Sequence, residues 1–435
     1  MTTMKVLRVA VAGLGTVGRE SVRLLMARRA ELKRRLGIDV RLVAVADRQA
    51  AREAKTLGLS PTVACYRDPL DMCRRAQADL FVELLGGLVT ARRVALAAIG
   101  RGKALVTANK RLLSHSWPEL SSAARRSGAR LAFEGSVAGG IPVLRALELS
   151  FSGDRILGLE GILNGTTNYI LSRGEEGVSP AAALREAQEL GFAEKDPTLD
   201  LSGQDAAQKL SVLAGLVTGG WLKPGSFPVE GIEAVTARDL SFARERLAMA
   251  VRLVGSLSFS GPSDSPSVSA SVAATLLPLD HPLAAVRRQY NALLVRTASA
   301  GDLMFYGQGA GAGPTASAVL ADIFVLARDM VGGLPPLTLA ARTLSQSSPE
   351  NSVSGYYLRL EVRDRPGALA RIADALGREG VSIAAIHQDR SIAGRSVPVM
   401  IATHPAARGR FERARKRILG LPAVFSRHCA MRMLS

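Results

Sequence analysis

A glycine-rich turn near the start of the chain is the feature that most constrains its fold. An apolar segment at residues 6–12 leads into Gly13-Leu14-Gly15-Thr16-Val17-Gly18, and a helical pattern then continues to about residue 36. This spacing matches the GxGxxG fingerprint, whose glycines permit a tight turn, close approach of the backbone to a pyrophosphate and close helix packing. A turn that merely requires glycine is the simpler reading. The strand before the motif and the helix after it favour a dinucleotide site at Gly13, Gly15, Thr16, Val17 and Gly18.

The end of the next apolar segment carries a second dinucleotide signal. Residues 40–46 end at Asp47, the position from which an acidic residue accepts hydrogen bonds from the adenosine ribose. Arg48 beside it could bind a 2′-phosphate instead. NAD and NADP therefore both remain open as cofactors, and Asp47 also fits as a turn or cap residue.

Strands that alternate with helices predict a parallel sheet in the first part of the chain. Apolar segments at 80–85 and 104–107 flank a helical pattern at 91–101, as right-handed crossovers require. From about residue 130 the pattern becomes mixed, and residues 356–433 follow the order βαββαβ. We therefore predict an α/β chain made of a Rossmann-type nucleotide-binding domain at 1–135 completed by a helix at about 314–335, a central α+β domain at 136–313, a linker at 336–354, and a βαββαβ, ferredoxin-like domain at 355–435.

Composition excludes several classes of protein. The 435 residues exceed what one hydrophobic core holds. The net charge of +18 comes mostly from arginines spread along helices, and only 4% of the residues are aromatic, so we expect no nucleic-acid partner, and the reason for the basic charge stays open. No apolar run reaches the roughly 18 residues needed to cross a bilayer, and we see no secretory signal, so we expect no membrane partner. Three cysteines without a CxxC pair favour a reducing, cytoplasmic location.

An acidic segment at residues 191–209 concentrates the polar side chains of the chain. Asp205 and Lys209 are four residues apart on a predicted helix and therefore share a face, while Glu194 and Asp200 lie in the preceding loop. Carboxylates suit the ammonium group of an amino-acid substrate, and a lysine held by an acid can give a proton to a carbonyl that receives hydride. Taken alone, the pair fits equally well a surface ion pair worth about 0.3–0.5 kcal/mol.

Five segments resemble the successive motifs of homoserine dehydrogenases and occur in that family's order. They are Val82-Glu83-Leu84-Leu85-Gly86-Gly87, Val106-Thr107-Ala108-Asn109-Lys110, Glu134-Gly135-Ser136-Val137-Ala138-Gly139-Gly140-Ile141-Pro142, Asn164-Gly165-Thr166-Thr167-Asn168-Tyr169 and the acidic segment itself. Their joint occurrence over about the first 330 residues is far more specific than any one of them. This chain has Ser202 at a position of the acidic segment where many family members have a glutamate. That position is not among the substrate ligands that the resemblance implies.

The resemblance implies reversible, NAD(P)-dependent hydride transfer between L-homoserine and L-aspartate 4-semialdehyde, on the route to threonine, methionine and isoleucine. It also implies that the central domain at 136–313 is the substrate-binding, catalytic and dimerisation domain. It implies that Lys209 is the proton donor and that Lys110 is a second essential lysine near nicotinamide and substrate. The implied substrate ligands are Gly165, Thr166, Glu194, Asp200 and Asp205, and the implied cofactor contacts add Gly86, Lys110 and Gly311 to the glycine-rich turn. Lys110 also fits a phosphate-binding or merely exposed lysine, but it follows a strand at the carboxyl edge of the sheet, where ligands bind.

The same resemblance implies a site for a monovalent cation, sodium. Its ligands would be the carboxylate of Glu134 and the backbone carbonyls of Val137, Gly139 and Ile141, since hard cations prefer oxygen. The alternative is a glycine-rich turn in which Glu134 is a local hydrogen-bond acceptor.

The tail at 356–433 resembles an ACT domain through Val362-Arg363-Asp364-Arg365-Pro366-Gly367-Ala368-Leu369 and Gly380-Val381-Ser382-Ile383. In such domains this first turn receives an amino acid when two copies pair. The resemblance therefore implies an effector site, with threonine as the effector, at Asp364, Gly367, Ala368 and Leu369 of a homodimer or homotetramer. A purely structural dimerising module is the alternative, because fold does not fix function.

Two other functions remain open at this stage. One is an NAD(P)-dependent oxidoreductase that has the same nucleotide-binding domain but acts on a different amino-acid derivative. The other is a non-catalytic protein that senses an amino acid. Retention of both Lys110 and Lys209 argues against the sensor. A phosphorylating aldehyde dehydrogenase is disfavoured, because neither Cys65 nor Cys73 sits in an active-site context for a nucleophile.

Overall fold

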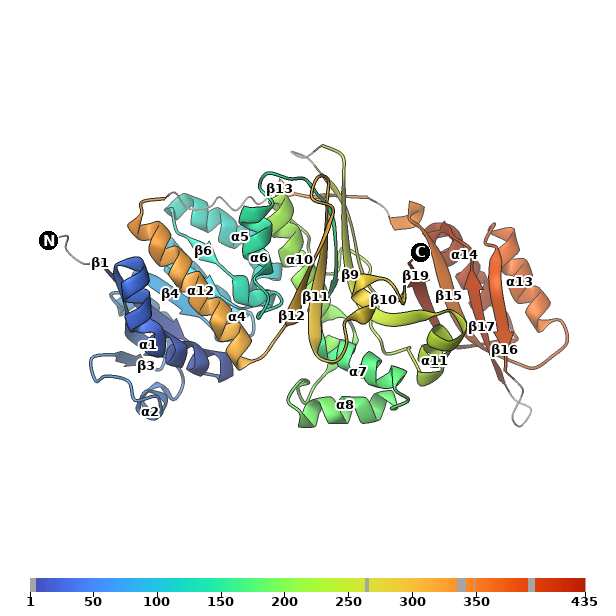
Figure 1. Cartoon of the computed structure of the whole chain (residues 1–435), viewed down its shortest axis with the longest axis horizontal. Coiled ribbons are helices and arrows are strands. Elements are labelled where there is room, and N and C mark those ends of the chain that lie inside the picture. Colours follow the sequence, from blue (N-terminus) through green and yellow to red (C-terminus); the bar gives the residue numbers. More distant parts are fainter. Residues whose placement is uncertain (1–4, 263–265, 335–341, 348, 390–395, 435) are drawn as a thin grey trace.

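The computed structural model describes residues 5–262, 266–334, 342–347, 349–389 and 396–434. Figure 1 shows an elongated molecule, with the N-terminal sheet at one end, long strands in the middle and the C-terminal domain at the other end. Within the described part of the chain, no helix combines the length and the apolar character that crossing a bilayer requires.

The N-terminal domain is built on a six-stranded parallel sheet in the order β3-β2-β1-β4-β5-β6. This is the strand order of a dinucleotide-binding Rossmann fold, as the sequence predicts. Its strands are β1 (Lys5–Ala12), β2 (Ile38–Ala46), β3 (Ala64–Tyr66), β4 (Leu80–Glu83), β5 (Ala104–Thr107) and β6 (Leu131–Ala132). β4 ends earlier than the predicted 80–85 because the chain turns at Gly86 and Gly87, which both have positive φ.

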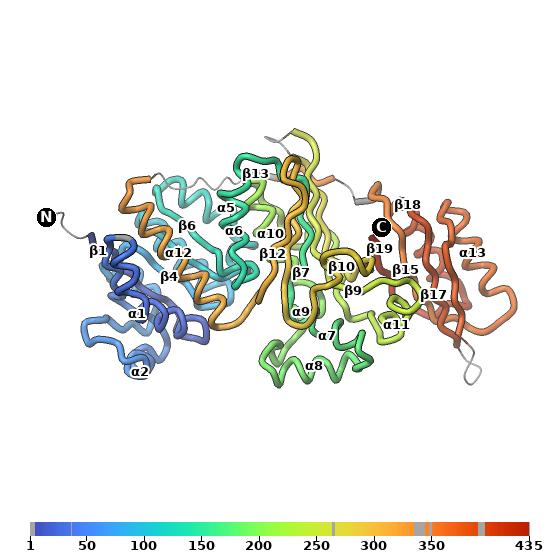
Figure 2. Tube along the Cα trace, viewed as in Figure 1, coloured from blue at the N-terminus to red at the C-terminus, as the bar shows by residue number. Residues whose placement is uncertain are grey.

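Helices cover both faces of this sheet. One face carries α1 (Thr16–Leu36) and α12 (Ala312–Val331), and the other carries α3 (Pro69–Arg75), α4 (Val89–Gly100) and α5 (Lys110–Ser127), while the short α2 (Ala50–Thr56) lies beside β3. Val319 and Ile323 of α12 share a core with Val9 of β1. Figure 2 shows the tube of α12 lying beside α1, although about 280 residues separate them in sequence. The predicted helix at 314–335 thus packs on the nucleotide-binding sheet, and it begins two residues earlier.

The central part of the chain is a mixed sheet covered by helices. Its strands are β7 (Ile156–Ile162), β9 (Met249–Ser260), β10 (Ser267–Pro278), β11 (Tyr290–Thr297) and β12 (Asp302–Gln308), in the order β12-β11-β7-β9-β10. Its helices are α6 (Val143–Arg145), continued by a π-helical turn at Ala146–Ser150, then α7 (Gly165–Glu175), α8 (Pro180–Glu189), α9 (Thr198–Leu201), α10 (Gln204–Thr218) and α11 (Ala237–Arg246). The short β8 (Gly220–Trp221) pairs with β13 (Arg342–Thr343).

The C-terminal domain has the predicted βαββαβ order. It consists of β15 (Val353–Val362), α13 (Ala368–Arg378), β16 (Ile383–Gln388), β17 (Val397–Thr403), α14 (Arg408–Leu419) and β19 (Val424–Met433), with β18 (Ala406–Ala407) beside β15. Its sheet order is β19-β15-β17-β16. The domain is not a free tail, because β19 pairs in parallel with β10 and the two sheets form one continuous sheet of eleven strands.

The segment before the C-terminal domain contains more pairing than a linker requires. Residues 336–341 and 348 of the predicted 336–354 linker lie outside the described residues. β13 pairs with β8, and β14 (Ser345–Gln346) pairs with β10. A short 3-10 turn at Pro349–Asn351 then leads into β15. Local polarity cannot reveal such pairing, because the partner strands are far away in sequence.

A buried ionic cluster fastens the C-terminal domain to α11. Asp239 Oδ1 accepts hydrogen bonds from the hydroxyl of Tyr357 (2.7 Å) and from Nε of Arg359 (2.8 Å), and Arg359 Nη2 donates to the Ala234 carbonyl (3.0 Å). The side chains of Asp239 and Arg359 are 0% and 3% exposed. Removing one partner of such a pair leaves the other charge buried and uncompensated.

We therefore expect Asp239→Ala to lower the free energy of unfolding by about 3–5 kcal/mol, the usual cost of breaking a buried ion pair. Urea unfolding followed by circular dichroism measures this loss. Asp374→Ala is the matched control, because its pair with Arg378 is largely exposed, and it should leave the midpoint unchanged. Equal effects of the two substitutions would show that the Asp239 cluster does not hold the domains together.

Candidate active site

The three glycines of the first turn differ in why the position takes a glycine. A Cβ on Gly13, which has φ of +96°, would lie 2.5 Å from the Leu84 carbonyl oxygen, and a Cβ on Gly18 would collide with the Gly13 carbonyl. A Cβ on Gly15 would meet no atom within 4 Å. Gly13 and Gly18 are therefore required by the fold. Gly15 leaves open space at the start of α1, where backbone N–H groups and the helix dipole favour a phosphate. The turn fits a bound dinucleotide.

Asp47 stabilises two turns through backbone hydrogen bonds, in line with the alternative that it is a turn residue. Its Oδ2 accepts the backbone N–H of Leu14 (3.0 Å), and its Oδ1 accepts the N–H of Gln49 (3.0 Å). Asp47 thus braces the glycine-rich turn and closes its own turn, and it is only partly buried. Arg48 is exposed beside it. The assignment of Asp47 to the ribose and of Arg48 to a 2′-phosphate stays a prediction.

A cavity of about 400 Å³ lies at the carboxyl edge of the nucleotide-binding sheet, where β5 ends. All seven predicted catalytic and substrate residues line it, together with the predicted cofactor contact Gly311. The seven are Lys110, Gly165, Thr166, Glu194, Asp200, Asp205 and Lys209. Four helices, α5, α7, α10 and α12, begin at or beside this cavity. Their N-termini create a positive potential that suits an anionic ligand.

Asp205 is the centre of the polar network in this cavity. Its Oδ2 lies 2.7 Å from Lys209 Nζ, and its Oδ1 lies 3.1 Å from Lys110 Nζ. Lys209 also donates to the Leu163 carbonyl at 2.6 Å. The side chains of Asp205 and Lys209 are each 9% exposed, so the reading of a solvated surface pair does not hold. One carboxylate therefore holds two ammonium groups on the same side of the cavity.

Charge and burial set the protonation states around Asp205. Burial opposes its ionisation, but the charges of Lys209 and Lys110 lower the pKa of its carboxyl well below the usual range. The charge of Asp205 in turn raises the pKa of Lys110. Burial and the nearby Asp205 raise the pKa of Asp200. At neutral pH the network thus keeps Asp205 ionised and Lys110 protonated, while Asp200 takes up a proton more readily than an exposed aspartate.

Lys110 occupies a position that helix stability does not favour. It is the first residue of α5, where the positive end of the helix dipole repels a cation. Asn109 caps the same helix by accepting the N–H of Leu112 (3.0 Å). The Lys110 side chain is 39% exposed, and its Nζ pairs with Asp205 in the cavity. The ion pair with Asp205 in the cavity, and not the stability of α5, therefore accounts for a lysine at this position.

Asn164 is a site residue that sequence reasoning missed. Its Nδ2 donates to Asp200 Oδ1 (2.7 Å) and to Asp205 Oδ2 (2.8 Å), and its Oδ1 accepts the N–H of Thr167 at the start of α7. The residue lies in one of the quoted motifs, but only its bridging contacts show its role. Thr166 donates to the Phe192 carbonyl (2.8 Å), and Glu194 is exposed at the rim.

The predicted cation ligand Glu134 has two partners in the structure. Its buried carboxylate accepts the backbone N–H groups of Leu144 (2.9 Å) and Arg145 (2.8 Å), and burial raises its pKa. The Ile141 carbonyl accepts the N–H of Val143 (2.7 Å). Each carboxylate and carbonyl oxygen has a second lone pair, so these contacts leave capacity for a hard cation. Among the described residues, no three His, Cys, Asp or Glu side chains gather as a metal site.

The predicted effector turn lies in the C-terminal domain, at the opposite end of the molecule from the nucleotide-binding sheet (Figure 1). Asp364 is exposed, and Gly367, with φ of +81°, caps the start of α13. Ala368 is buried and Leu369 partly buried in the domain core. In the same domain, His387 contacts Asp389 and His404 is exposed.

A dinucleotide-binding sheet that carries an acidic, lysine-lined cavity at its carboxyl edge defines a nicotinamide-dependent oxidoreductase. Comparison with known proteins specifies the family. Residues 13–134 match the model for the homoserine dehydrogenase NAD-binding domain, residues 142–324 match homoserine dehydrogenase, and residues 356–423 match the ACT domain. The chain belongs to the homoserine dehydrogenase family and carries a C-terminal ACT domain.

Individual relatives agree over nearly the whole chain. Homoserine dehydrogenase of Corynebacterium glutamicum is 37% identical, over 98% of this chain and 95% of the relative, and that of Neisseria gonorrhoeae is 37% identical over 92% of each. The crystal structure of a homoserine dehydrogenase from Thiobacillus denitrificans superposes with a TM-score of 0.90 at 34% identity, covering 99% of both chains. A hyperthermophilic archaeal homoserine dehydrogenase in complex with NADPH matches 76% of this chain and 99% of its own, with a TM-score of 0.62 at 25% identity.

The glycine contacts generate a test of the dinucleotide site. Gly15→Ala should keep the unfolding midpoint of the parent chain, because its Cβ meets open space, but it should weaken NAD(P)H binding by at least about tenfold by filling the pyrophosphate position. Gly18→Ala should instead lower the midpoint, because its Cβ collides with backbone. Fluorescence titration with NADH and NADPH and thermal unfolding measure the two effects. Unchanged affinity of Gly15→Ala for both cofactors would place the dinucleotide elsewhere.

Proposed function

We propose that the chain interconverts L-homoserine and L-aspartate 4-semialdehyde at the cavity around Asp205. The observation that carries this proposal is a buried carboxylate that holds two lysines beside the carboxyl edge of the nucleotide-binding sheet. The homoserine dehydrogenases that cover almost the whole chain support the choice of substrate. The route to threonine, methionine and isoleucine is the corresponding biosynthetic setting.

Each side chain has a proposed role. Bound NAD(P) supplies or accepts the hydride. Lys209, fixed by Asp205 and the Leu163 carbonyl, gives a proton to the aldehyde oxygen during reduction and takes the hydroxyl proton during oxidation. Lys110 places a second positive charge near the same oxygen. Glu194 and Asp200 receive the substrate ammonium, and Gly165 and Thr166 orient the substrate at the start of α7.

Lys209→Ala tests this assignment. Loss of a general acid should lower kcat by about 10²–10⁴-fold and leave NAD(P)H affinity unchanged, because Lys209 lies on the substrate side of the cavity. Homoserine oxidation, followed by the absorbance of the reduced nicotinamide, measures kcat. Lys195→Ala is the matched control, since Lys195 belongs to the same acidic segment but is exposed and does not line the cavity. A normal kcat for Lys209→Ala would contradict the mechanism.

We further propose that the enzyme uses NADP or NAD through Asp47 and Arg48, with Gly86 and Gly311 at the far end of the cofactor. The NADPH complex of the archaeal relative supports NADP. The positive φ angles of Gly86 (+70°) and Gly311 (+120°) support close approach of backbone to a ligand at both positions. The homoserine assay with both cofactors measures the preference. A cytoplasmic location agrees with this role and stays a prediction.

A monovalent cation, sodium, is the second proposed ligand, held by Glu134 and by the carbonyls of Val137, Gly139 and Ile141. Sodium should raise the thermal unfolding midpoint relative to choline at equal ionic strength, because a ligand that binds only the folded state stabilises it. Glu134→Gln should lose this difference. Glu148→Gln, which changes a neighbouring acid outside the proposed ligand set, should keep it. Identical midpoints of the parent chain in sodium and in choline would exclude the site.

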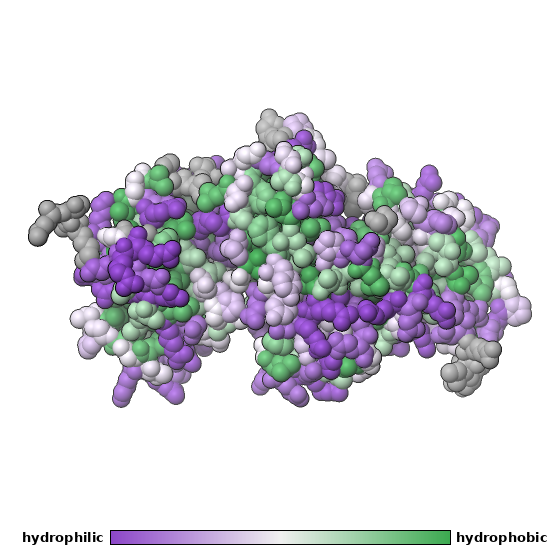
Figure 3. All heavy atoms as spheres, in the orientation of Figure 1, coloured by the Kyte–Doolittle hydropathy of each residue, from purple (hydrophilic) through white to green (hydrophobic). Residues whose placement is uncertain are grey.

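The ACT domain is the proposed regulatory part, with threonine bound at Asp364, Gly367, Ala368 and Leu369 where two copies meet in a homodimer or homotetramer. Exposed Met304 and Tyr306 on the edge strand β12 support contact between copies, and in Figure 3 apolar side chains gather over the upper part of the central strands.

Millimolar L-threonine should slow homoserine oxidation, and Asp364→Ala should reduce this inhibition. Asp374→Ala is the control, because Asp374 is also exposed in this domain, and it should retain the inhibition. A rate independent of threonine would leave the domain a purely structural module.

A further inference from the structure

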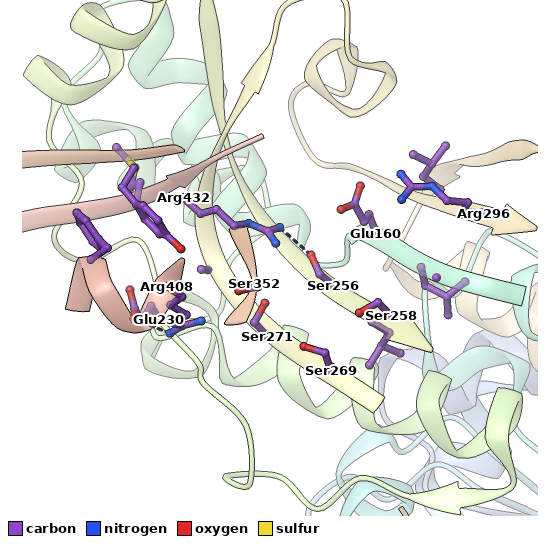
Figure 4. A pocket seen from close by; sticks show the side chains of 18 of the residues that line it. Glu160, Glu230, Ser256, Ser258, Ser269, Ser271, Arg296, Ser352, Arg408 and Arg432 are labelled. Atoms are coloured by element: carbon purple, nitrogen blue, oxygen red, sulfur yellow. Dashed lines mark hydrogen bonds and ion pairs between the residues drawn. The ribbon is translucent and has the colours of Figure 1, made fainter. Parts of the chain in front are cut away.

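The charges of the cavity between the central sheet and the ACT domain are matched within the chain. Figure 4 shows this cavity, of about 190 Å³, which Arg296 of β11 helps to line. Arg408 Nη2 lies 3.8 Å from a carboxylate oxygen of Glu230, and the charge of Glu160 acts on Arg432. Buried polar atoms without a partner lie instead near the other end of β11, behind the active-site cavity.

Asn291, the second residue of β11, carries a buried amide that has no hydrogen-bond partner. The residue is 1% exposed, and within the described part of the chain neither its Nδ2 nor its Oδ1 forms a hydrogen bond. Asn168 Oδ1 also lacks a partner, and Asn168 Nδ2 donates to the carbonyl of Tyr290, next to Asn291 (3.1 Å). An amide buried without hydrogen bonds lowers the stability of the fold. Its presence therefore calls for a reason beyond the stability of the free chain.

The Asn291 amide lies against two segments that line the active-site cavity. A Cβ on Gly309 would lie 2.0 Å from Nδ2 and 2.7 Å from Oδ1, so the amide packs directly on this glycine. A Cβ on Gly165, the first residue of α7, would lie 3.5 Å from Oδ1. Gly165 lines the cavity, and so do Ala310 and Gly311, which follow Gly309. Asn291 does not line the cavity, so it acts on a bound ligand only through these two segments.

Both segments are also tied to other parts of the site. The carbonyl of Gly309 accepts the N–H of Gly139 (2.9 Å), which fixes the loop from the side of the proposed cation site. The start of α7 is capped by Asn164, whose Nδ2 also donates to Asp205 Oδ2 (2.8 Å). A link between the two segments therefore connects the loop at 309–311 with the network that holds the proton donor.

We propose that Asn291 is a positioning residue, whose amide makes this link when substrate and cofactor occupy the cavity. In that state Oδ1 accepts an N–H at the start of α7, where helix geometry leaves N–H groups without partners, and Nδ2 donates to a carbonyl of the loop at 309–311. The two hydrogen bonds fix the substrate side of the cavity relative to the loop, and the rate depends steeply on such placement. This inference rests on the proposed function of the cavity.

Asn291→Leu tests the proposal, because it keeps a branched side chain and removes both polar atoms. The thermal midpoint of the free chain should stay or rise, since a buried group without hydrogen bonds is removed. L-Homoserine should bind about tenfold more weakly to the chain loaded with reduced cofactor, a pair that cannot react, because two hydrogen bonds of the occupied state are lost. The kcat of homoserine oxidation should fall by at least about tenfold. Thermal unfolding, calorimetric titration and the absorbance assay measure the three effects.

Thr297→Val is the matched control on the same strand. Thr297 is 4% exposed, and its hydroxyl donates to the Gly301 carbonyl (3.0 Å) and accepts the Ala300 N–H (3.1 Å). The substitution keeps the shape and removes hydrogen bonds that the free chain makes. It should therefore lower the thermal midpoint and leave kcat and homoserine affinity unchanged, which is the opposite of the result expected for Asn291→Leu.

A lower midpoint for Asn291→Leu with the kcat and homoserine affinity of the parent chain would overturn the proposal, because the amide would then serve only the fold. Parent values in all three measurements would overturn it as well. If Asn291→Leu does not fold, Asn291→Ser, which keeps a donor and an acceptor, should retain a higher kcat than Asn291→Ala, and equal rates of these two variants would contradict a polar role.

The parent chain separates this inference from the function on which it rests. A parent chain that does not oxidise homoserine contradicts the proposed function and this inference with it. An active parent chain with an equally active Asn291→Leu variant contradicts the role of Asn291 alone.

Discussion

The ionised carboxylate of Asp205 is the group on which the active site depends. It is almost fully removed from water, and such a charge is costly unless it is paired and hydrogen-bonded. Two lysines and the amide of Asn164 supply that compensation, and none of them is adjacent to Asp205 in sequence. Because one carboxylate holds both ammonium groups, the distance between the proton donor and the second lysine is set by the fold rather than by flexible side chains.

The architecture brings these groups together by making helices begin at one place. Lys110 starts α5 at the carboxyl edge of the nucleotide-binding sheet, and Asp205 lies in the first turn of α10. Close packing joins the two helices, because a Cβ on Gly215 of α10 would lie 2.9 Å from the Trp117 ring of α5. The nucleotide-binding domain and the substrate side of the cavity therefore share one packed core.

Features that depend on local patterns could be predicted from the sequence. The glycine-rich turn, the parallel strands and the βαββαβ tail were predictable because glycine spacing and hydrophobic periodicity act within a few residues. The pairing of β19 with β10 was not, since strand register between distant segments leaves no local signal. For the same reason the role of Asn164, which bridges Asp200 and Asp205, could not be predicted although the residue lies within one of the motifs. The Asp205–Lys209 spacing was visible, but only burial distinguishes it from a solvated pair.

The most direct test of this account is the protonation of Lys110, measured by NMR titration of the chain with ¹³C-labelled lysine ε-carbons and assigned with Lys110→Arg. If the Asp205 charge governs the network, the Lys110 pKa lies above its ordinary value in the parent chain and falls in the isosteric Asp205→Asn variant. The same Lys110 pKa in both chains would mean that Asp205 does not hold the two lysines, and the central claim would be wrong.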